Sequence, residues 1–239
     1  MNDEKLPRVM LLDLDDTLLA RSAAADLAVK KVSVIYGSRL SGLFSEEDLR
    51  LSLFKTSDAF WGDPEKEAWG RVNLFDAQRM ITKEALEVLD VKQQGLSDEI
   101  ADTCSRLQYD YTEPFPGTIE ALEAFIRHKV RLVLVANGST LMQWAKIERF
   151  KLKKYFHDCL IEGDLGFGKP DIRIFNLALK HAGTSTEKVW NVGHSLAQDV
   201  QIPQMLGMYA VWNDYKGRGL KEYDGIKPDR VITSLTDLV

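Results

Sequence analysis

Short apolar runs recur along the chain and predict the strands of one sheet. The first lies within Arg8–Leu14 and is continuously apolar up to Asp13, as in a strand buried on both faces. Similar runs follow, separated by helix-like segments, and this alternation predicts a parallel sheet with crossover helices. They lie at Val130–Val135, Val189–Val192, Tyr209–Trp212 and Arg230–Ile232. We therefore predict an α/β fold with helices on both faces of a parallel sheet.

Residues 20–111 show a different pattern, with apolar residues at intervals of three and four and no comparable strand run. This spacing predicts an inserted helical module. Its expected helices are Ala23–Tyr36, Ser45–Phe60, Lys66–Met80, Thr82–Asp90 and Ser97–Tyr111. The segment Pro114–Gly117 is predicted to be the linker by which the chain returns from this module to the core. An amphipathic helix is predicted after it, at Thr118–His128. We predict a core of residues 1–19 and 112–239 and an all-helical domain of residues 20–111.

Composition narrows the classes of protein to consider. The 239 residues are 45% hydrophobic and 28% charged, as in an ordinary globular protein. A net charge of −5 gives no sign of the positively charged surface that binds nucleic acid. No apolar run reaches membrane-spanning length. Cys104 and Cys159 are too few for a disulfide framework. We expect a cytoplasmic protein that binds neither nucleic acid nor membrane.

Carboxylates follow the first strand at the place where parallel sheets bind ligands. Asp13 and Asp15 are two residues apart, so their side chains project to the same side while the chain stays extended. Loops and helix N-termini converge beyond the carboxyl ends of parallel strands. An isolated Asp here is more simply explained as a helix cap or turn residue. The grouping of Asp13, Asp15 and Asp16 favours a site.

The string DLDDT, residues 13–17, after its apolar strand resembles the first motif of the haloacid dehalogenase-like hydrolases. The resemblance implies a Rossmann-like core in which Asp13 attacks phosphorus and forms an aspartyl-phosphate. It also implies that Asp15 is the general acid and base, and that Mg²⁺ is held by the Asp13 carboxylate and the Asp15 carbonyl. Dehalogenation is disfavoured, because dehalogenases of the family lack the second Asp, and Thr17 favours a phosphatase.

Two further segments resemble later motifs of this family. After the strand ending at Val135, the family carries a Ser or Thr followed by Asn, whereas this chain has Ala136 and Asn137. The backbone donors of Asn137 and Gly138 are expected to bind phosphoryl oxygens, and the missing hydroxyl removes a hydrogen bond worth roughly 1.5–3 kcal/mol. Lys169, followed by a proline and a predicted helix, is expected to neutralise the nucleophile and to bind phosphate.

The fourth motif departs from the family pattern at one position. The chain has Gly193-His194-Ser195 where the family has Gly-Asp-Ser, while Asp199 stands where the family's second Asp does. Imidazole is a poor ligand for Mg²⁺ but suits Mn²⁺, Co²⁺ or Zn²⁺. His194 therefore binds such a metal, or is hydrogen-bonded scaffold while Asp199 serves as the ligand. The predicted metal ligands are Asp13, Asp15, His194 and Asp199.

These motifs imply a hydrolase that cleaves a phosphate monoester of a small phosphorylated metabolite, with the inserted domain as a helical cap over the site. Ala136 and His194 leave an alternative open. In that alternative the chain is a catalytically impaired relative that binds a phosphorylated ligand or partner without efficient turnover. A monomer or a homodimer is expected in either case.

Overall fold

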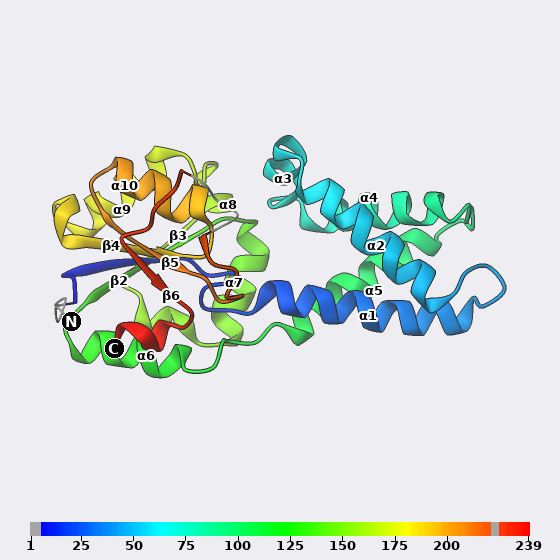
Figure 1. The fold of residues 1–239 in the computed structure, drawn as a ribbon, viewed down its shortest axis with the longest axis horizontal. Helices are drawn as coiled ribbons and strands as arrows, with labels where there is room; N and C mark the ends of the chain where they lie inside the picture. Colours follow the sequence, from blue (N-terminus) through cyan, green and yellow to red (C-terminus); the bar gives the residue numbers. More distant parts are fainter. Residues whose placement is uncertain (1–5, 221–224) are drawn as a thin grey trace. The chain divides into compact units, whose positions relative to one another are not determined.

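The computed structural model describes residues 6–220 and 225–239. The chain folds into two compact units. One unit comprises Met1–Ala20 and Pro114–Val239, and the other comprises Arg21–Glu113 (Figure 1). The first holds the sheet and the second is made of helices. No helix among the described residues combines the length and the apolar character that crossing a bilayer requires.

The first unit is built on a six-stranded sheet in the order β3-β2-β1-β4-β5-β6, and every neighbouring pair is parallel. The strands are β1 (Val9–Leu12), β2 (Arg131–Ala136), β3 (Asp158–Ile161), β4 (Val189–Gly193), β5 (Tyr209–Asn213) and β6 (Arg230–Ile232). The predicted α/β class is confirmed, and each predicted strand is present. β3 was not predicted, because this edge strand has an apolar run of only three residues.

Helices and short helical turns connect these strands or follow the last of them. They are α6 (Thr118–Arg127), α7 (Thr140–Arg149), η1 (Leu152–Tyr155), α8 (Glu162–Leu165), α9 (Ile172–Ala182), η2 (Thr186–Lys188), η3 (Leu196–Gln201), α10 (Ile202–Met205) and η5 (Leu235–Leu238). Most are 3₁₀ or α-helical, whereas η3 is a π-helix. Ser139 caps the start of α7 by accepting a hydrogen bond from the Met142 N–H.

The strand β1 shows how the sheet is buried from both sides. Its side chains alternate between two hydrophobic clusters, as the two-residue repeat of a strand requires. Met10 and Leu12 pack with residues of α6 and α7, whereas Val9 and Leu11 pack with residues of α9. The two helical layers lie on opposite faces of the sheet in Figure 1. This double burial explains why the run before Asp13 has no polar position.

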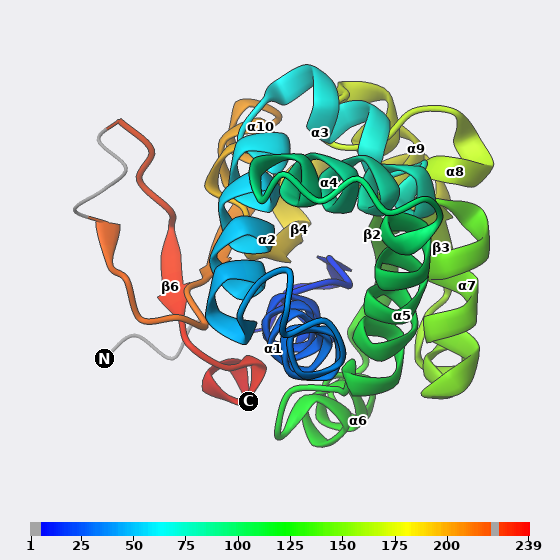
Figure 2. The ribbon, with the colours of Figure 1, turned by 90° about the vertical axis from the view of Figure 1, so that its right-hand side faces the viewer.

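The second unit has its own hydrophobic core. Its helices are α1 (Arg21–Arg39), α2 (Glu46–Trp61), α3 (Pro64–Gly70), α4 (Leu74–Val88) and α5 (Leu96–Tyr111). Both α1 and α4 pack against α2 and α5, so the four long helices enclose one cluster of apolar side chains (Figure 2). The predicted helix Lys66–Met80 is wrong, because the chain breaks at residues 71–73. The predicted helix Thr82–Asp90 is instead the second half of α4.

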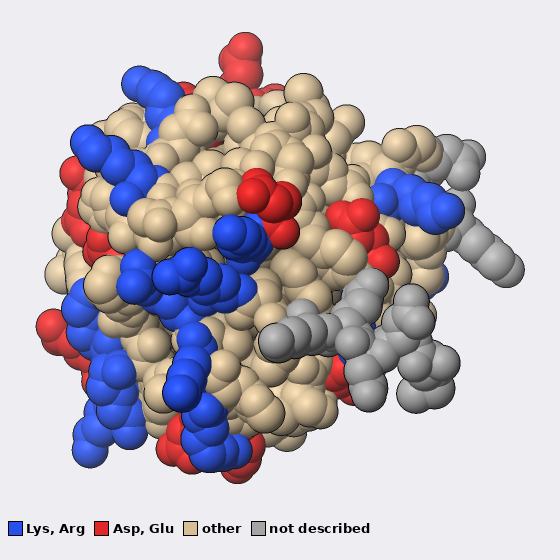
Figure 3. Space-filling model, turned by 90° about the vertical axis from the view of Figure 1, so that its left-hand side faces the viewer, with Lys and Arg blue, Asp and Glu red and all other residues tan. Residues whose placement is uncertain are grey.

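Lysines and arginines gather on the face of the molecule drawn in Figure 3. In a sheet of parallel strands with crossover helices, helix C-termini and strand starts meet at the amino edge. Exposed cations stand at such positions in α6, β2 and α9, namely Arg127, Arg131 and Lys180. Positive charge near a helix C-terminus is favourable to the helix dipole. These cations therefore lie at the edge of the sheet opposite the carboxylates that follow β1.

We expect Leu12→Ala to destabilise the first unit by about 2–5 kcal/mol, because it opens a cavity in the central strand, where Leu12 is fully buried. Urea unfolding followed by circular dichroism measures this. Leu141→Ala is the matched control, since Leu141 is 71% exposed and should change the unfolding free energy by less than about 0.5 kcal/mol. Similar losses in the two variants would contradict the central placement of β1.

Candidate functional site

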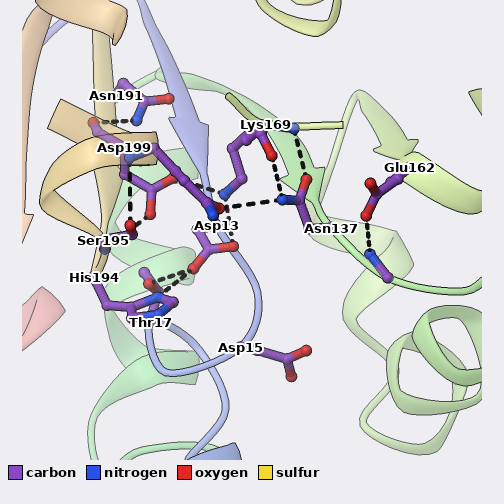
Figure 4. Close-up of polar contacts among 12 residues, drawn as sticks. Asp13, Asp15, Thr17, Asn137, Glu162, Lys169, Asn191, His194, Ser195 and Asp199 are labelled. Atoms are coloured by element: carbon purple, nitrogen blue, oxygen red, sulfur yellow. Dashed lines mark hydrogen bonds and ion pairs between the residues drawn. The ribbon is translucent and has the colours of Figure 1, made fainter. Parts of the chain in front are cut away.

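Polar side chains converge at the carboxyl ends of the three central strands. Because β2, β1 and β4 are neighbours, the residues that follow them meet at one edge of the sheet. Asp13 follows β1, Asn137 follows β2 and His194 follows β4. Figure 4 shows these side chains grouped around Lys169 and Asp199. The sheet order thus brings together motifs that are up to 186 residues apart in the sequence, from Asp13 to Asp199.

Asp13 is buried and both of its carboxylate oxygens accept hydrogen bonds. Oδ1 accepts from Lys169 Nζ at 2.8 Å. Oδ2 accepts from the Thr17 hydroxyl at 2.9 Å and lies 2.9 Å from His194 Nδ1. Burial by itself raises the pKa of Asp13, but the Lys169 ammonium and the His194 imidazole together hold that pKa well below its usual range. Asp13 is therefore an ionised carboxylate in a protein interior.

Lys169 is buried between two carboxylates. Its Nζ donates to Asp13 and, at 2.6 Å, to Asp199 Oδ1. Burial alone lowers the pKa of Lys169, but the two carboxylates raise it above its usual value. Asn137 fixes the backbone of Lys169 from both sides, because its Oδ1 accepts from the Lys169 N–H at 2.7 Å and its Nδ2 donates to the Lys169 carbonyl at 2.6 Å. The Asn137 side chain therefore positions Lys169.

Asp199 lies in the π-helical turn that follows β4. Its Oδ2 accepts the Ser195 N–H at 3.0 Å, and its backbone carbonyl accepts from Asn191 Nδ2 at 2.7 Å. Burial raises the pKa of Asp199, with Asp13 acting in the same direction and Lys169 opposing it. A π-turn is uncommon and is often found at functional sites. Here it carries Asp199 to within reach of Lys169.

His194 takes the position where the family pattern has a carboxylate. Its backbone carbonyl accepts from Trp212 Nε1 at 2.9 Å, and its ring contacts Asp13 while about a third of its side chain, 36%, stays exposed. Burial of the ring works to lower its pKa, but the hydrogen bond and the charge of Asp13 outweigh it and raise the pKa of His194 to about 9. Asp13 therefore favours the protonated form of this imidazole.

Gly138 is placed near this cluster, but its N–H already has a partner. It donates to Glu162 Oε2 at 2.9 Å. The expected role of this N–H, donation to a phosphoryl oxygen, requires the Glu162 carboxylate to move away. Glu162 itself was missed, because an acidic residue after a short edge strand has no distinguishing pattern.

Asp15 lies apart from the cluster, and its carboxylate points away from Asp13 (Figure 4). The expectation that both side chains project to one side is wrong, because β1 ends at Leu12 and the chain turns. Asp15 forms a bridge with Leu19, and Asp16 has a positive φ of 56°. The carboxylate of Asp15 instead contacts Lys146, with both oxygens 2.6 Å from Nζ.

Lys146 and Gln143 were missed by the sequence analysis, although a signal was available. They lie three residues apart on the buried side of α7, where an amphipathic helix normally carries apolar residues. Polar residues at such positions require hydrogen-bond partners. Asp15 is the partner of both. Gln143 Nε2 donates to Asp15 Oδ2 at 3.0 Å, and Lys146 Nζ lies 2.6 Å from both Asp15 oxygens.

Three side chains in the cluster have the chemistry of metal ligands. One ligand atom from each of Asp13, His194 and Asp199 lies within 4.8 Å of the others. Two buried carboxylates with one imidazole make a mixed oxygen and nitrogen donor set. Such a set fits a borderline divalent cation better than Mg²⁺, which prefers oxygen alone. The fourth predicted ligand, the carbonyl of Asp15, stays a prediction.

A sequence model of the haloacid dehalogenase-like hydrolases matches residues 7–207. The chain belongs to this family. The match spans both units and includes Asp13, Asn137, Lys169, His194 and Asp199. The resemblance inferred from the motifs is thereby confirmed, and with it the assignment of the protein to a family of hydrolases.

Characterised relatives of this haloacid dehalogenase-like hydrolase include several phosphatases. Phosphoserine phosphatase of Thermus thermophilus is 30% identical over 97% of both chains. Glyceraldehyde 3-phosphate phosphatase of Methanocaldococcus jannaschii is 31% identical over 53% of this chain and 55% of that protein. The chain therefore spans about half the length of the second relative. Pyrimidine 5′-nucleotidase PynA of Streptococcus pneumoniae is 24% identical over 97% of this chain and 93% of that protein.

Solved structures confirm the fold of the family. The magnesium-bound HAD-hydrolase YfnB of Bacillus subtilis superposes with a TM-score of 0.76 at 20% identity, covering 98% of this chain and 97% of that one. A 2-haloacid dehalogenase of Pseudomonas syringae gives a TM-score of 0.63 at 22% identity, covering 98% and 96%. At these identities the likeness concerns the fold alone.

We expect Gly193→Ala to disrupt the cluster, because a Cβ at this position would lie 2.2 Å from Asp199 Cγ. Such overpacking costs typically about 1–3 kcal/mol, which urea unfolding measures. Gly42→Ala is the control, since nothing lies within 4 Å of its added Cβ. If Gly193→Ala were as stable as Gly42→Ala, Asp199 would not pack against β4 as described.

Proposed function

We propose that this haloacid dehalogenase-like hydrolase is a divalent-metal-dependent phosphatase that cleaves a phosphate monoester of a small metabolite. The observation that carries the proposal is the buried Asp13 carboxylate, held ionised beside Lys169, Thr17 and His194. An ionised carboxylate is a nucleophile, and the Lys169 ammonium beside it offsets the repulsion of an anionic phosphate. Phosphatases among the relatives support this reaction class.

The reaction has two displacements in this proposal. Asp13 attacks phosphorus to form an aspartyl-phosphate while the ester P–O bond breaks, and the departing alkoxide takes a proton from the carboxyl of Asp15. Water then attacks phosphorus and gives a proton back to Asp15, which releases inorganic phosphate and free Asp13. Lys169 remains protonated through both steps and binds the phosphoryl oxygens as a fixed positive charge.

Asp13, His194 and Asp199, with the carbonyl of Asp15, are the proposed ligands of the divalent cation. Bound there, the cation would neutralise charge on the phosphoryl group and orient it toward Asp13. Mg²⁺ is the metal that the family resemblance implies, whereas the imidazole in the donor set favours Mn²⁺, Co²⁺ or Zn²⁺. Metal binding competes with the proton on His194, because only the neutral imidazole coordinates a metal.

A second candidate function rests on the contacts that already occupy this site. The Gly138 N–H is engaged by Glu162, and the side chain at position 136 offers no hydroxyl. These features favour a relative that binds a phosphorylated ligand or partner with little turnover. The intact set of Asp13, Asp15 and Lys169 favours catalysis.

Asp13→Asn should lower the hydrolysis of p-nitrophenyl phosphate by at least about a thousandfold, since the amide is not a nucleophile. Turnover is measured with Mg²⁺, Mn²⁺, Co²⁺ or Zn²⁺ in turn, and again after chelation. Asp26→Asn, at an exposed position of α1, is the control and should keep full activity. Equal activity in Asp13→Asn and the wild type would remove Asp13 as the nucleophile.

His194→Asp should shift the metal preference toward Mg²⁺, because it makes the side-chain donor set entirely oxygen. The measured quantity is the ratio of activity with Mg²⁺ to activity with Mn²⁺, expected to rise by about tenfold or more. His128→Asp, at an exposed position after α6, should leave the ratio unchanged. An inactive wild type with activity only in His194→Asp would instead favour the impaired relative.

A further inference from the structure

Lys146 is a buried lysine that lies outside the four motifs identified in the sequence. It lies on α7 with 9% of its side chain exposed, and its Nζ is 2.6 Å from both oxygens of Asp15, whose side chain is 20% exposed. A buried ammonium is costly unless it is paired and hydrogen-bonded. The contact with both oxygens restricts rotation of the Asp15 carboxylate. Lys146 is therefore an anchor for Asp15.

Gln143 adds a second contact to the same carboxylate. Its Nε2 donates to Asp15 Oδ2 at 3.0 Å and also to the carbonyl of Asn137. Its Oε1 is buried without a hydrogen-bond partner among the described residues. Leaving a buried acceptor unpaired costs about 1–3 kcal/mol, and such groups in native proteins call for an explanation. Here the amide gives up one hydrogen bond while its nitrogen serves two acceptors.

The loop after β2 provides room for this amide. Gly138 has a φ of 121°, and a Cβ added there would lie 2.8 Å from Gln143 Nε2. A glycine is thus required both by the backbone conformation and by the closeness of the Gln143 side chain. Gln143 connects this loop to Asp15, and the loop also supplies Asn137, which positions Lys169.

We propose that Lys146 and Gln143 are positioning residues that fix the carboxyl group of Asp15 for proton transfer to the leaving group. The inference rests on the proposed function, in which Asp15 gives its proton to the departing oxygen and recovers one from water. Lys146 and Gln143 keep their own protons throughout. They orient Asp15, and the Lys146 ammonium also stabilises the carboxylate that is left once Asp15 has given up its proton. A displacement of a catalytic group by about 1 Å can cost roughly a hundredfold in rate.

This role predicts a dependence on the leaving group. A phenolate with a nitro group departs without protonation, whereas more basic phenolates need a proton as the P–O bond breaks. A badly oriented Asp15 should therefore slow basic leaving groups far more than p-nitrophenolate. Loss of fold or of active protein lowers all rates equally and leaves the ratio between substrates unchanged.

The experiment compares p-nitrophenyl, phenyl and 4-methoxyphenyl phosphates as substrates of each variant, under the metal condition that is best for the wild type. For Lys146→Met we expect phenyl phosphate hydrolysis to fall by about a hundredfold and p-nitrophenyl phosphate hydrolysis by only a few fold. Gln143→Leu should change the ratio in the same direction by a smaller factor. Lys146→Arg, which keeps a cation near Asp15, should recover most of the ratio.

Lys180→Met is the matched control, since Lys180 is exposed on α9 and should leave every rate unchanged. Equal losses on all three substrates in Lys146→Met, or no loss, would overturn the inference. A wild type whose rate already falls with leaving-group basicity as steeply as Lys146→Met would also overturn it. A wild type that hydrolyses none of the three substrates would contradict the proposed function itself.

Discussion

The arrangement of the site depends on one buried ammonium. Lys169 lies between the carboxylates of Asp13 and Asp199, at 2.8 and 2.6 Å, and all three side chains are almost completely buried. Two carboxylates this close repel each other strongly in a medium of low dielectric constant. The ammonium makes their proximity tolerable, and removing one partner of such a buried pair usually costs about 3–5 kcal/mol. The remaining contacts keep this ammonium in place.

The neighbouring loops are arranged so that Lys169 and Asp199 stay within hydrogen-bond distance of each other. Asn137 bonds the backbone of Lys169, so the loop after β2 and the loop before α9 cannot shift independently. The π-turn η3 and the bare Cα of Gly193 together bring Asp199 against the end of β4. Asn137 follows β2, Asp13 follows β1, and Gly193 and Asp199 lie at the end of β4. The strand order β2-β1-β4 is therefore the property of the fold that makes the charge cluster possible.

The sequence predicted the central strands and the charged members of the cluster, because both have strong local signals. The run before Asp13 is apolar on both faces, and Lys169 and Asp199 stand in recognisable motifs. β3 and the break between α3 and α4 lack such signals, since a three-residue apolar run and a continuing helical period are ambiguous. Polar residues on the buried side of α7 carry a signal that they have partners. Their pairing with Asp15, and that of Gly138 with Glu162, was not predictable, because these partners lie 24 to 131 positions apart and are fixed by packing.

The two aspartates of the first motif occupy different electrostatic environments although only one residue separates them. Asp13 is buried with Lys169 and His194, whereas Asp15 is partly exposed and anchored by Lys146 and Gln143. Carboxylates that must differ in protonation during a reaction are distinguished by their surroundings. The turn after Leu12 separates the side chains, and each then acquires its own lysine. The separation of Asp13 from Asp15 thus gives the two carboxylates the different surroundings that the proposed roles of nucleophile and acid/base require.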